Sequence, residues 1–135
     1  MSEMNLLQQY GVEDRVVHLF ASESDVKNLY AFAKAFIYPS LYEGFGMPIL
    51  EAFAYGCPVL LNKKSCFPEI ADDAGFFFHD DNDFSDLREK MEEVLDWNDE
   101  KRNFIIQKGY KRLTSFRWEE ASRQLLAVYH SVMNR

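Results

Sequence analysis

One stretch of the sequence indicates the fold class most clearly, namely Tyr38-Pro-Ser-Leu-Tyr-Glu-Gly-Phe-Gly-Met-Pro-Ile-Leu-Glu51. It follows the short apolar run Ala35–Tyr38, which predicts a strand. It leads into Met47–Tyr55, which predicts a helix because Pro48 lies in its first turn and Gly56 just past its end. A strand that turns directly into a helix is the repeating unit of a parallel α/β sheet. Ligands of such sheets bind outside the carboxyl ends of the strands, so this turn is also a candidate site.

Short apolar runs on either side of this stretch extend the pattern. Arg15–Phe20, Pro58–Leu61 and Gly75–Phe78 predict three further strands, whose continuous apolar character is typical of a parallel sheet covered on both faces. Helical periodicity marks the segments between and after these runs. The predicted helices are Glu3–Tyr10, Ser24–Lys34, Phe84–Leu95, Asp99–Thr114 and Trp118–Met133. We therefore expect a Rossmann-like, doubly wound α/β domain with a parallel sheet and a helical C-terminal extension.

Composition narrows the class of protein. The 135 residues fit one domain, and 47% of them are apolar, which indicates a folded core. A net charge of −7 argues against a nucleic-acid partner, because such surfaces gather Lys and Arg. No apolar run approaches the roughly 20 residues that cross a bilayer, and Met1–Tyr10 is too polar for a signal peptide. Cys57 and Cys66 lack metal-site spacing, so we expect reduced thiols in a cytoplasmic protein without a bound metal.

The turn between Glu43 and Glu51 carries groups suited to a phosphorylated ligand. Gly44 and Gly46 allow the backbone to turn sharply and to approach a ligand closely. The helix that begins near Pro48 offers free N–H groups and the positive end of its dipole to an anion. On spacing alone, a mere tight turn explains the two glycines equally well, and that alternative stays open.

The two carboxylates sharpen the prediction. Glu43 and Glu51 would repel a bare phosphate, but an ionised carboxylate accepts hydrogen bonds from hydroxyl groups. Amides for phosphate together with carboxylates for sugar or ribose hydroxyls fit a nucleotide sugar. The alternative for Glu51 is a first-turn charge that only complements the helix dipole.

The chain continues this stretch as Glu51-Ala-Phe-Ala-Tyr-Gly-Cys-Pro-Val59. From Tyr38 to Val59 it resembles the Glu-x7-Glu signature of the retaining GT-B glycosyltransferases of family 4 (group 1). Other segments match in family order, namely Asp14-Arg-Val16, Pro68-Glu-Ile70, Asp73–Phe78 and Phe116-Arg-Trp-Glu119. The resemblance covers nearly the whole chain and implies the C-terminal, donor-binding domain of such an enzyme.

The resemblance implies a role for each part of the signature. Glu43 matches the residue that binds hydroxyls of the donor sugar, and Glu51 matches the one that binds the ribose. The loop Gly44–Met47 matches the loop whose backbone amides face the sugar and the diphosphate, and the turn Ser65–Pro68 also approaches the donor. We therefore predict Glu43 as the catalytic residue. The predicted donor-binding residues are Gly44, Phe45, Gly46, Met47, Pro48, Glu51, Ser65 and Cys66.

The implied reaction transfers a hexose from a nucleotide diphosphate sugar to an acceptor hydroxyl, with retention of anomeric configuration and without a metal or other cofactor. Family members carry an acceptor-binding half and an Arg and Lys that clamp the diphosphate, and neither has a match here. We therefore expect residues 1–135 to form a partial donor-binding domain that is inactive alone. We also expect self-association through a bared sheet edge and apolar face. Bacterial envelope polysaccharide synthesis, with peripheral membrane association only in a longer protein, is the expected setting.

Two other functions share the fold class. A non-catalytic nucleotide-sugar-binding module differs only in lacking a catalytic partner domain, and it remains the alternative. A receiver-like signalling domain needs clustered acidic residues at the strand ends. Because the predicted ends carry Tyr38-Pro39, Asn62-Lys63 and His79, we discount it.

A few further residues have a simpler interpretation than a site. Asp81-Asn-Asp83 mimics the metal-binding motif of another glycosyltransferase class, but we interpret it as a loop leading to a helix N-cap at Asp83. We interpret His18 and His79 as core or surface groups, and Lys63-Lys64 as a solvated pair.

Overall fold

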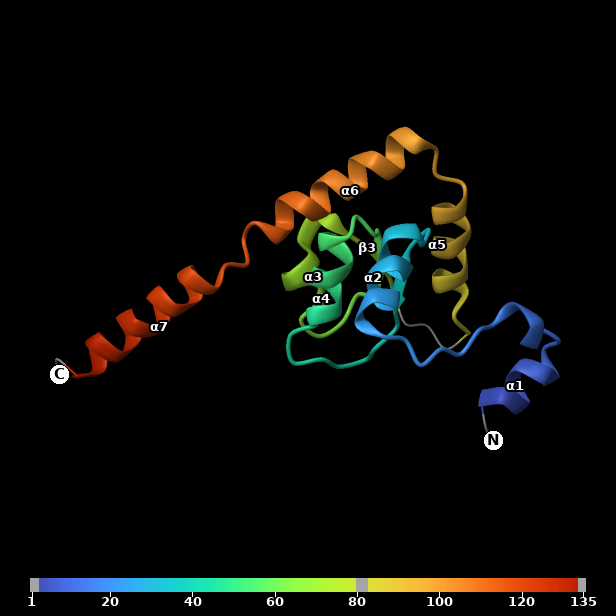
Figure 1. Cartoon of the computed structure of the whole chain (residues 1–135), viewed down its shortest axis with the longest axis horizontal. Coiled ribbons are helices and arrows are strands. Elements are labelled where there is room, and N and C mark those ends of the chain that lie inside the picture. The colour runs from blue at the N-terminus through green and yellow to red at the C-terminus, as the bar shows by residue number, and fades with distance from the viewer. Residues whose placement is uncertain (1–2, 80–82, 134–135) are drawn as a thin grey trace.

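The computed structural model describes residues 3–79 and 83–133, and its centre is a three-stranded parallel sheet (Figure 1). The strands are β1 (Phe36–Tyr38), β2 (Val59–Asn62) and β3 (Gly75–Phe78), and they lie in the spatial order β1-β2-β3. Ile37 of β1 lies opposite Leu60, which in turn lies opposite Phe76 of β3. The corresponding strand predictions and the parallel arrangement are confirmed.

Helices connect and follow the strands. In the described part of the chain they are α1 (Glu3–Gln9), α2 (Glu23–Phe32), α3 (Met47–Ala54), α4 (Phe67–Ala71), α5 (Ser85–Leu95), α6 (Asp99–Leu113) and α7 (Trp118–Met133). Short 3-10 turns occupy Glu13–Arg15 (η1) and Asp72–Ala74 (η2). Each predicted helix is confirmed, with ends shifted by at most two residues. Helix α4 is an addition, since the sequence indicated only a turn there.

Local side chains determine where two of these helices begin. Ser22 and Asp25 form a capping box at α2, in which the Ser22 Oγ accepts the Asp25 N–H at 3.3 Å and the Asp25 carboxylate accepts the Ser22 N–H at 2.9 Å. At α6, Asn98 accepts the N–H of Lys101 at 2.8 Å. Both contacts satisfy N–H groups that a helix start leaves without an intrahelical partner.

The start of α5 differs from its prediction. Phe84, with φ of +57°, occupies the N-cap position that the sequence indicated for Asp83. Asp83 still acts locally, because its Oδ1 accepts the N–H of Ser85 at 3.1 Å. Asp81 and Asn82 lie outside the described residues.

The main core lies between the sheet and helices α3, α4 and α6. Its buried side chains are Ile49, Leu50, Ala52, Phe53, Cys57, Val59, Leu61, Phe67, Ile70, Ala71 and Ala74. Packing is close at Gly109 of α6, where a Cβ atom would lie 2.7 Å from Cδ1 of Phe53. Burial raises the pKa of the Cys57 thiol to about 11, so this cysteine is a protonated core group. Cys57 and Cys66 are both free thiols, as predicted.

The opposite face of the sheet is covered by α5. Val94 is buried there, and just beyond α5 the Trp97 ring meets Phe76 of β3 edge-on, with centroids 5.2 Å apart. Beside α5 an apolar hollow of about 140 Å³ is lined by Lys34, Ala35, Ile37, Leu60, Met91, Val94 and Leu95. Helices therefore lie on both faces of the sheet, which confirms the doubly wound class.

The strand predicted at Arg15–Phe20 is wrong. Arg15 ends the η1 turn, and Val16–Phe20 joins no strand of the described chain. A strand exists only where a neighbour takes up its backbone N–H and C=O groups, so an apolar run without such a neighbour stays unpaired. The side chains of Val17 and Phe20 are exposed as a result.

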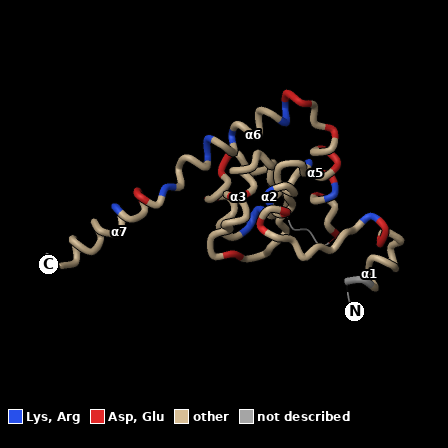
Figure 2. Tube along the Cα trace, viewed as in Figure 1, with Lys and Arg blue, Asp and Glu red and all other residues tan. Residues whose placement is uncertain are grey.

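Helix α7 extends away from the rest of the molecule (Figure 1), which confirms the predicted helical extension. Its apolar stripe is exposed, from Trp118 at 81% to Met133 at 81%. Acidic and basic residues are mixed along α5 and α6 (Figure 2). Across residues 3–79 and 83–133, every helix is too short or too polar to cross a membrane.

Candidate functional site

The predicted site lies where the chain passes from β1 into α3. Gly46 is the N-cap of α3 and has φ of +92° and ψ of 46°, a left-handed conformation that glycine adopts without strain. A Cβ atom at Gly46 would lie 3.2 Å from Cδ1 of Ile49 and 3.3 Å from Cε1 of Phe67. At Gly44, in contrast, a Cβ atom would meet nothing within 4 Å. Gly46 is therefore required by the turn itself, whereas Gly44 leaves one side of the loop open.

A second loop, between β2 and α4, holds the first one in place. The Glu43 N–H donates to the Ser65 Oγ at 3.1 Å, and the Ser65 hydroxyl donates back to the Glu43 carbonyl at 2.9 Å. The Cys66 thiol donates to the carbonyls of Phe45 at 3.1 Å and of Glu43 at 3.4 Å. The structure thus brings together four residues that the sequence placed in one site from two distant segments.

These contacts engage the carbonyl groups of the loop and leave its amides available. In the described part of the chain, no protein acceptor takes the backbone N–H of Gly44, Phe45, Gly46 or Met47. Pro48 is the second residue of α3 and has no N–H to contribute. The loop therefore carries N–H groups without a protein acceptor at the start of a helix, where the helix dipole favours an anion. Gly44, Phe45 and Met47 are exposed, whereas Gly46 is buried.

Tyr38 is a member of this site that the sequence analysis missed. Its phenol donates to Oε1 of Glu43 at 2.7 Å. This hydrogen bond raises the pKa of Tyr38 to about 12, and burial and the Glu43 charge act in the same direction. The available signal was position, because Tyr38 is the last residue of β1 and therefore lies at the ligand-binding edge of a parallel sheet.

Glu51 lies one turn into α3, and its side chain is exposed. It stands beyond the first turn, which contains no acidic residue, so the helix-dipole alternative does not explain it. Burial raises the pKa of Tyr30 in α2, and the Glu51 charge adds to this effect.

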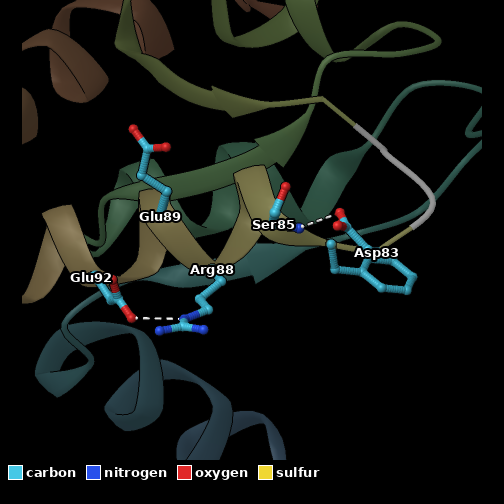
Figure 3. A pocket seen from close by; sticks show the side chains of 6 residues that line it. Asp83, Ser85, Arg88, Glu89 and Glu92 are labelled. Atoms are coloured by element: carbon cyan, nitrogen blue, oxygen red, sulfur yellow. Dashed lines mark hydrogen bonds and ion pairs between the residues drawn. The ribbon is translucent and has the colours of Figure 1, made fainter.

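A depression larger than the apolar hollow beside α5 lies at the start of α5 (Figure 3). It has a volume of about 600 Å³, and its lining residues are Asp83, Phe84, Ser85, Arg88, Glu89 and Glu92. One of its walls is an exposed ion pair in which the Arg88 Nε lies 2.9 Å from the Glu92 Oε1. None of the sequence-predicted site residues lines it, so it is separate from the β1–α3 turn.

The histidines His18 and His79 lie outside the β1–α3 turn. His79 is exposed and contacts Asp86, through its N–H at 2.7 Å and its Nδ1 at 3.2 Å. His18 packs against Phe20, with ring centroids 5.4 Å apart. Among the described residues, no group of three or more His, Cys, Asp or Glu side chains is placed to hold a metal ion.

Comparison with known proteins places the chain in a family. Residues 2–112 match the family described as glycosyl transferases group 1, so the chain belongs to that family. Over 110 residues it is 36% identical to the O-antigen chain mannosyltransferase B of Escherichia coli, covering 82% of this chain and 28% of the relative. Over 134 residues it is 28% identical to the MMP alpha-(1->4)-mannosyltransferase of Mycolicibacterium hassiacum, covering 96% of this chain and 32% of the relative.

The fold also matches a solved structure. The sucrose-phosphate synthase of Thermosynechococcus elongatus superposes with a TM-score of 0.78 at 24% sequence identity, covering 97% of this chain and 33% of that chain. This likeness confirms the Rossmann-like fold. The chain spans about a third of the length of these relatives.

Proposed function

We propose that this chain is the donor-binding part of a retaining GT-B glycosyltransferase of family 4, which moves a hexose from a nucleotide diphosphate sugar to an acceptor hydroxyl. One observation carries the proposal, namely the row of unclaimed amides at Gly44–Met47 between the carboxylates of Glu43 and Glu51. Family membership and the mannosyltransferase relatives support it.

The donor's chemistry fits this row of groups. Diphosphate oxygens accept hydrogen bonds, and the amides of the Gly44–Met47 loop donate them without rearrangement because no protein acceptor competes. An ionised carboxylate offers about four lone-pair positions, so Glu43 keeps acceptor capacity for sugar hydroxyls after Tyr38 has taken one. Glu51, one turn further along α3, is the acceptor we assign to the ribose hydroxyls.

Catalysis in this proposal rests on positioning and on charge. As the bond from the sugar to the diphosphate breaks, negative charge grows on the departing phosphate oxygen. Fixed N–H groups at Gly44–Met47 would stabilise that charge, and Glu43 would hold the sugar in register. Ser65 and Cys66 contribute by fixing the loop through the Glu43 and Phe45 backbone. No metal or other cofactor has a role in this scheme.

We take mannose as the first sugar to test, because several relatives are named mannosyltransferases. Two of them are named for O-antigen chains, which supports a role in envelope polysaccharide synthesis. The chain covers 28% of one such relative. We therefore propose that transfer needs the acceptor-binding half of a longer protein and that residues 1–135 alone bind the donor without transferring it.

Donor titration of the 135-residue chain tests the proposal directly. We expect GDP-mannose, or a UDP- or ADP-sugar in parallel titrations, to shift the amide NMR signals of Gly44–Met47. Glu51→Ala should weaken binding by about 1–3 kcal/mol through loss of a charged acceptor, or about 5- to 150-fold in Kd. Glu119→Ala removes a carboxylate from exposed α7 and should leave the Kd unchanged. If no nucleotide sugar perturbs this loop, the proposed function is wrong.

Kinetics in a protein that includes an acceptor-binding half separates the enzyme from the alternative binding module. Glu43→Gln should mainly lower kcat, because it alters contacts at the reacting sugar. Glu51→Ala should mainly raise KM for the donor. Donor binding without sugar transfer in such a protein would instead establish the non-catalytic module.

A further inference from the structure

The segment between α6 and α7 contacts the candidate donor loop. Phe116 lies in this segment, and its ring meets the Phe45 ring edge-on, with centroids 5.9 Å apart and planes at 88°. Phe45 is 41% exposed, whereas Phe116 packs against the main core. The loop therefore rests on a side chain that comes from the far end of the chain.

Phe116 is itself held firmly. Its N–H donates to the Leu113 carbonyl at 3.1 Å, which continues the last turn of α6. The Arg112 guanidinium lies over the Phe116 ring at 5.0 Å from its centroid. The same guanidinium donates to the carbonyls of Ile70 at 2.9 Å and Glu69 at 2.5 Å in α4. Arg112 thus ties the Phe116 ring to the carboxyl half of α4.

Helix α4 links the contacts at Phe116 to those made by Ser65 and Cys66. Just before its first residue, Ser65 and Cys66 hold the backbone of Glu43 and Phe45. At its other end, Arg112 binds the α4 backbone and lies over the Phe116 ring, which in turn contacts the Phe45 side chain. The donor loop is therefore fastened from both ends of one short helix.

The Ser65–Cys66 turn and Phe116 both contact the Gly44–Met47 loop, whose backbone is flexible by itself. Phe45 stands between Gly44 and Gly46, the two residues of the loop with the greatest backbone freedom. Its carbonyl contact with Cys66 is a thiol hydrogen bond, which is weak. The ring contact with Phe116 therefore adds a restraint on the Phe45 side chain to the hydrogen bonds that Ser65 and Cys66 make with the loop backbone.

We propose that Phe116 is a positioning residue for the Gly44–Met47 loop, so that the segment leading into α7 is coupled to donor binding. The ligand part of this inference rests on the proposed function, and the loop part does not. Donor binding would in turn restrict the segment that carries Phe116.

Backbone 15N relaxation without ligand tests the loop part, because the Gly44–Met47 amides have no protein acceptor and therefore little protection from hydrogen exchange. In Phe116→Ala, the order parameters of these amides should fall from about 0.85, typical of rigid backbone, toward about 0.6. Order parameters at Leu60 and Leu61 of β2 should stay unchanged, which separates loop release from general destabilisation. Phe116→Tyr keeps the ring and should restore the wild-type order parameters. Leu126→Ala, on exposed α7, is the matched control and should change nothing at the loop.

GDP-mannose titration of the same variants tests the ligand part. The Kd should rise for Phe116→Ala and return to the wild-type value for Phe116→Tyr. Unchanged order parameters at the loop in Phe116→Ala would overturn the inference, whatever the titration shows. Equal donor affinity in all variants, despite lower loop order parameters, would overturn its ligand part. If no variant binds a nucleotide sugar, the proposed function fails, and the relaxation result alone decides whether Phe116 positions the loop.

Discussion

The α3–β2–α4 core and two peripheral segments, Val16–Phe20 and α7, all contain large apolar side chains, but these side chains differ in burial. Phe67 in the core is 0% exposed, whereas Phe20 is 100% exposed. Along α7, Trp118 and Met133 are each 81% exposed, although the helix has a clear apolar stripe. An apolar pattern thus specifies a surface that must be covered, and the covering element has to come from elsewhere in the structure.

The core holds the candidate site, whereas the peripheral segments are the surfaces through which we expect the chain to self-associate. The core positions the Glu43–Glu51 turn with buried side chains and paired strands. The peripheral segments present exposed apolar groups, which are typical of surfaces that contact another protein. The predictions below test this contrast, beginning with the largest expected effect.

The first prediction compares one phenylalanine from each region. Phe67→Ala should lower the free energy of unfolding by about 3–5 kcal/mol, since it removes a fully buried ring. Phe20→Ala should change it by no more than about 0.5 kcal/mol. Urea unfolding followed by circular dichroism measures both. A cost for Phe20→Ala close to that of Phe67→Ala would show that the Val16–Phe20 segment packs in solution.

The second prediction compares two glycines with positive φ. Gly46→Ala should cost about 2–4 kcal/mol, because it adds left-handed strain to contacts with the buried side chains of Ile49 and Phe67. At Gly11, with φ of +62°, a Cβ atom meets nothing within 4 Å, so Gly11→Ala should cost about 1–2 kcal/mol from strain alone. The same unfolding experiment ranks the two. Equal costs would mean that the core yields around a Cβ atom at Gly46.

The third prediction concerns pH and the Tyr38–Glu43 hydrogen bond. The folded state raises the pKa of Tyr38 to about 12, above its ordinary value of about 10. The contribution of the Tyr38–Glu43 hydrogen bond to the free energy of unfolding is therefore fully present below pH 10 and is lost as the pH rises toward 12. Tyr38→Phe should remove this part of the alkaline loss of stability. The measurement is the free energy of unfolding of both proteins between pH 9 and 12, and parallel curves would contradict the assignment.

The smallest expected effect on stability is on α7. Leu126→Ser and Val132→Ser replace exposed residues and should leave the free energy of unfolding within about 0.5 kcal/mol of the wild-type value. They should still weaken self-association of the chain, which we expect at high protein concentration through apolar surfaces that exclude Glu43 and Glu51. Light scattering across a concentration series measures it. A strictly monomeric wild-type chain at millimolar concentration would show that these surfaces do not attract each other.

Local chemistry was sufficient to predict most of the secondary structure. Pro48 and Gly56 bracket α3, and the apolar runs at β2 and β3 are long enough to indicate buried strands. These signals act within a few residues of where they stand, so they can be read without a structure. The run Arg15–Phe20 misled because strand pairing is not local, and the run itself carries no information on whether a neighbour exists.

Some features of the candidate site were likewise predictable from local sequence, and others were not. Adjacent residues were enough to predict the Glu43–Glu51 turn, its two glycines and the helix start behind it, because these features are local. The packed structure showed that the backbone needs glycine at position 46 and not at position 44. It also showed that Tyr38 donates to Glu43, that Ser65 and Cys66 hold the loop, and that Phe116 contacts Phe45. The last two sets of contacts join residues from different loops, and their partners are set by how α4 and α6 pack on the sheet. Packing of that kind depends on the whole core and cannot be read from the spacing of any one motif.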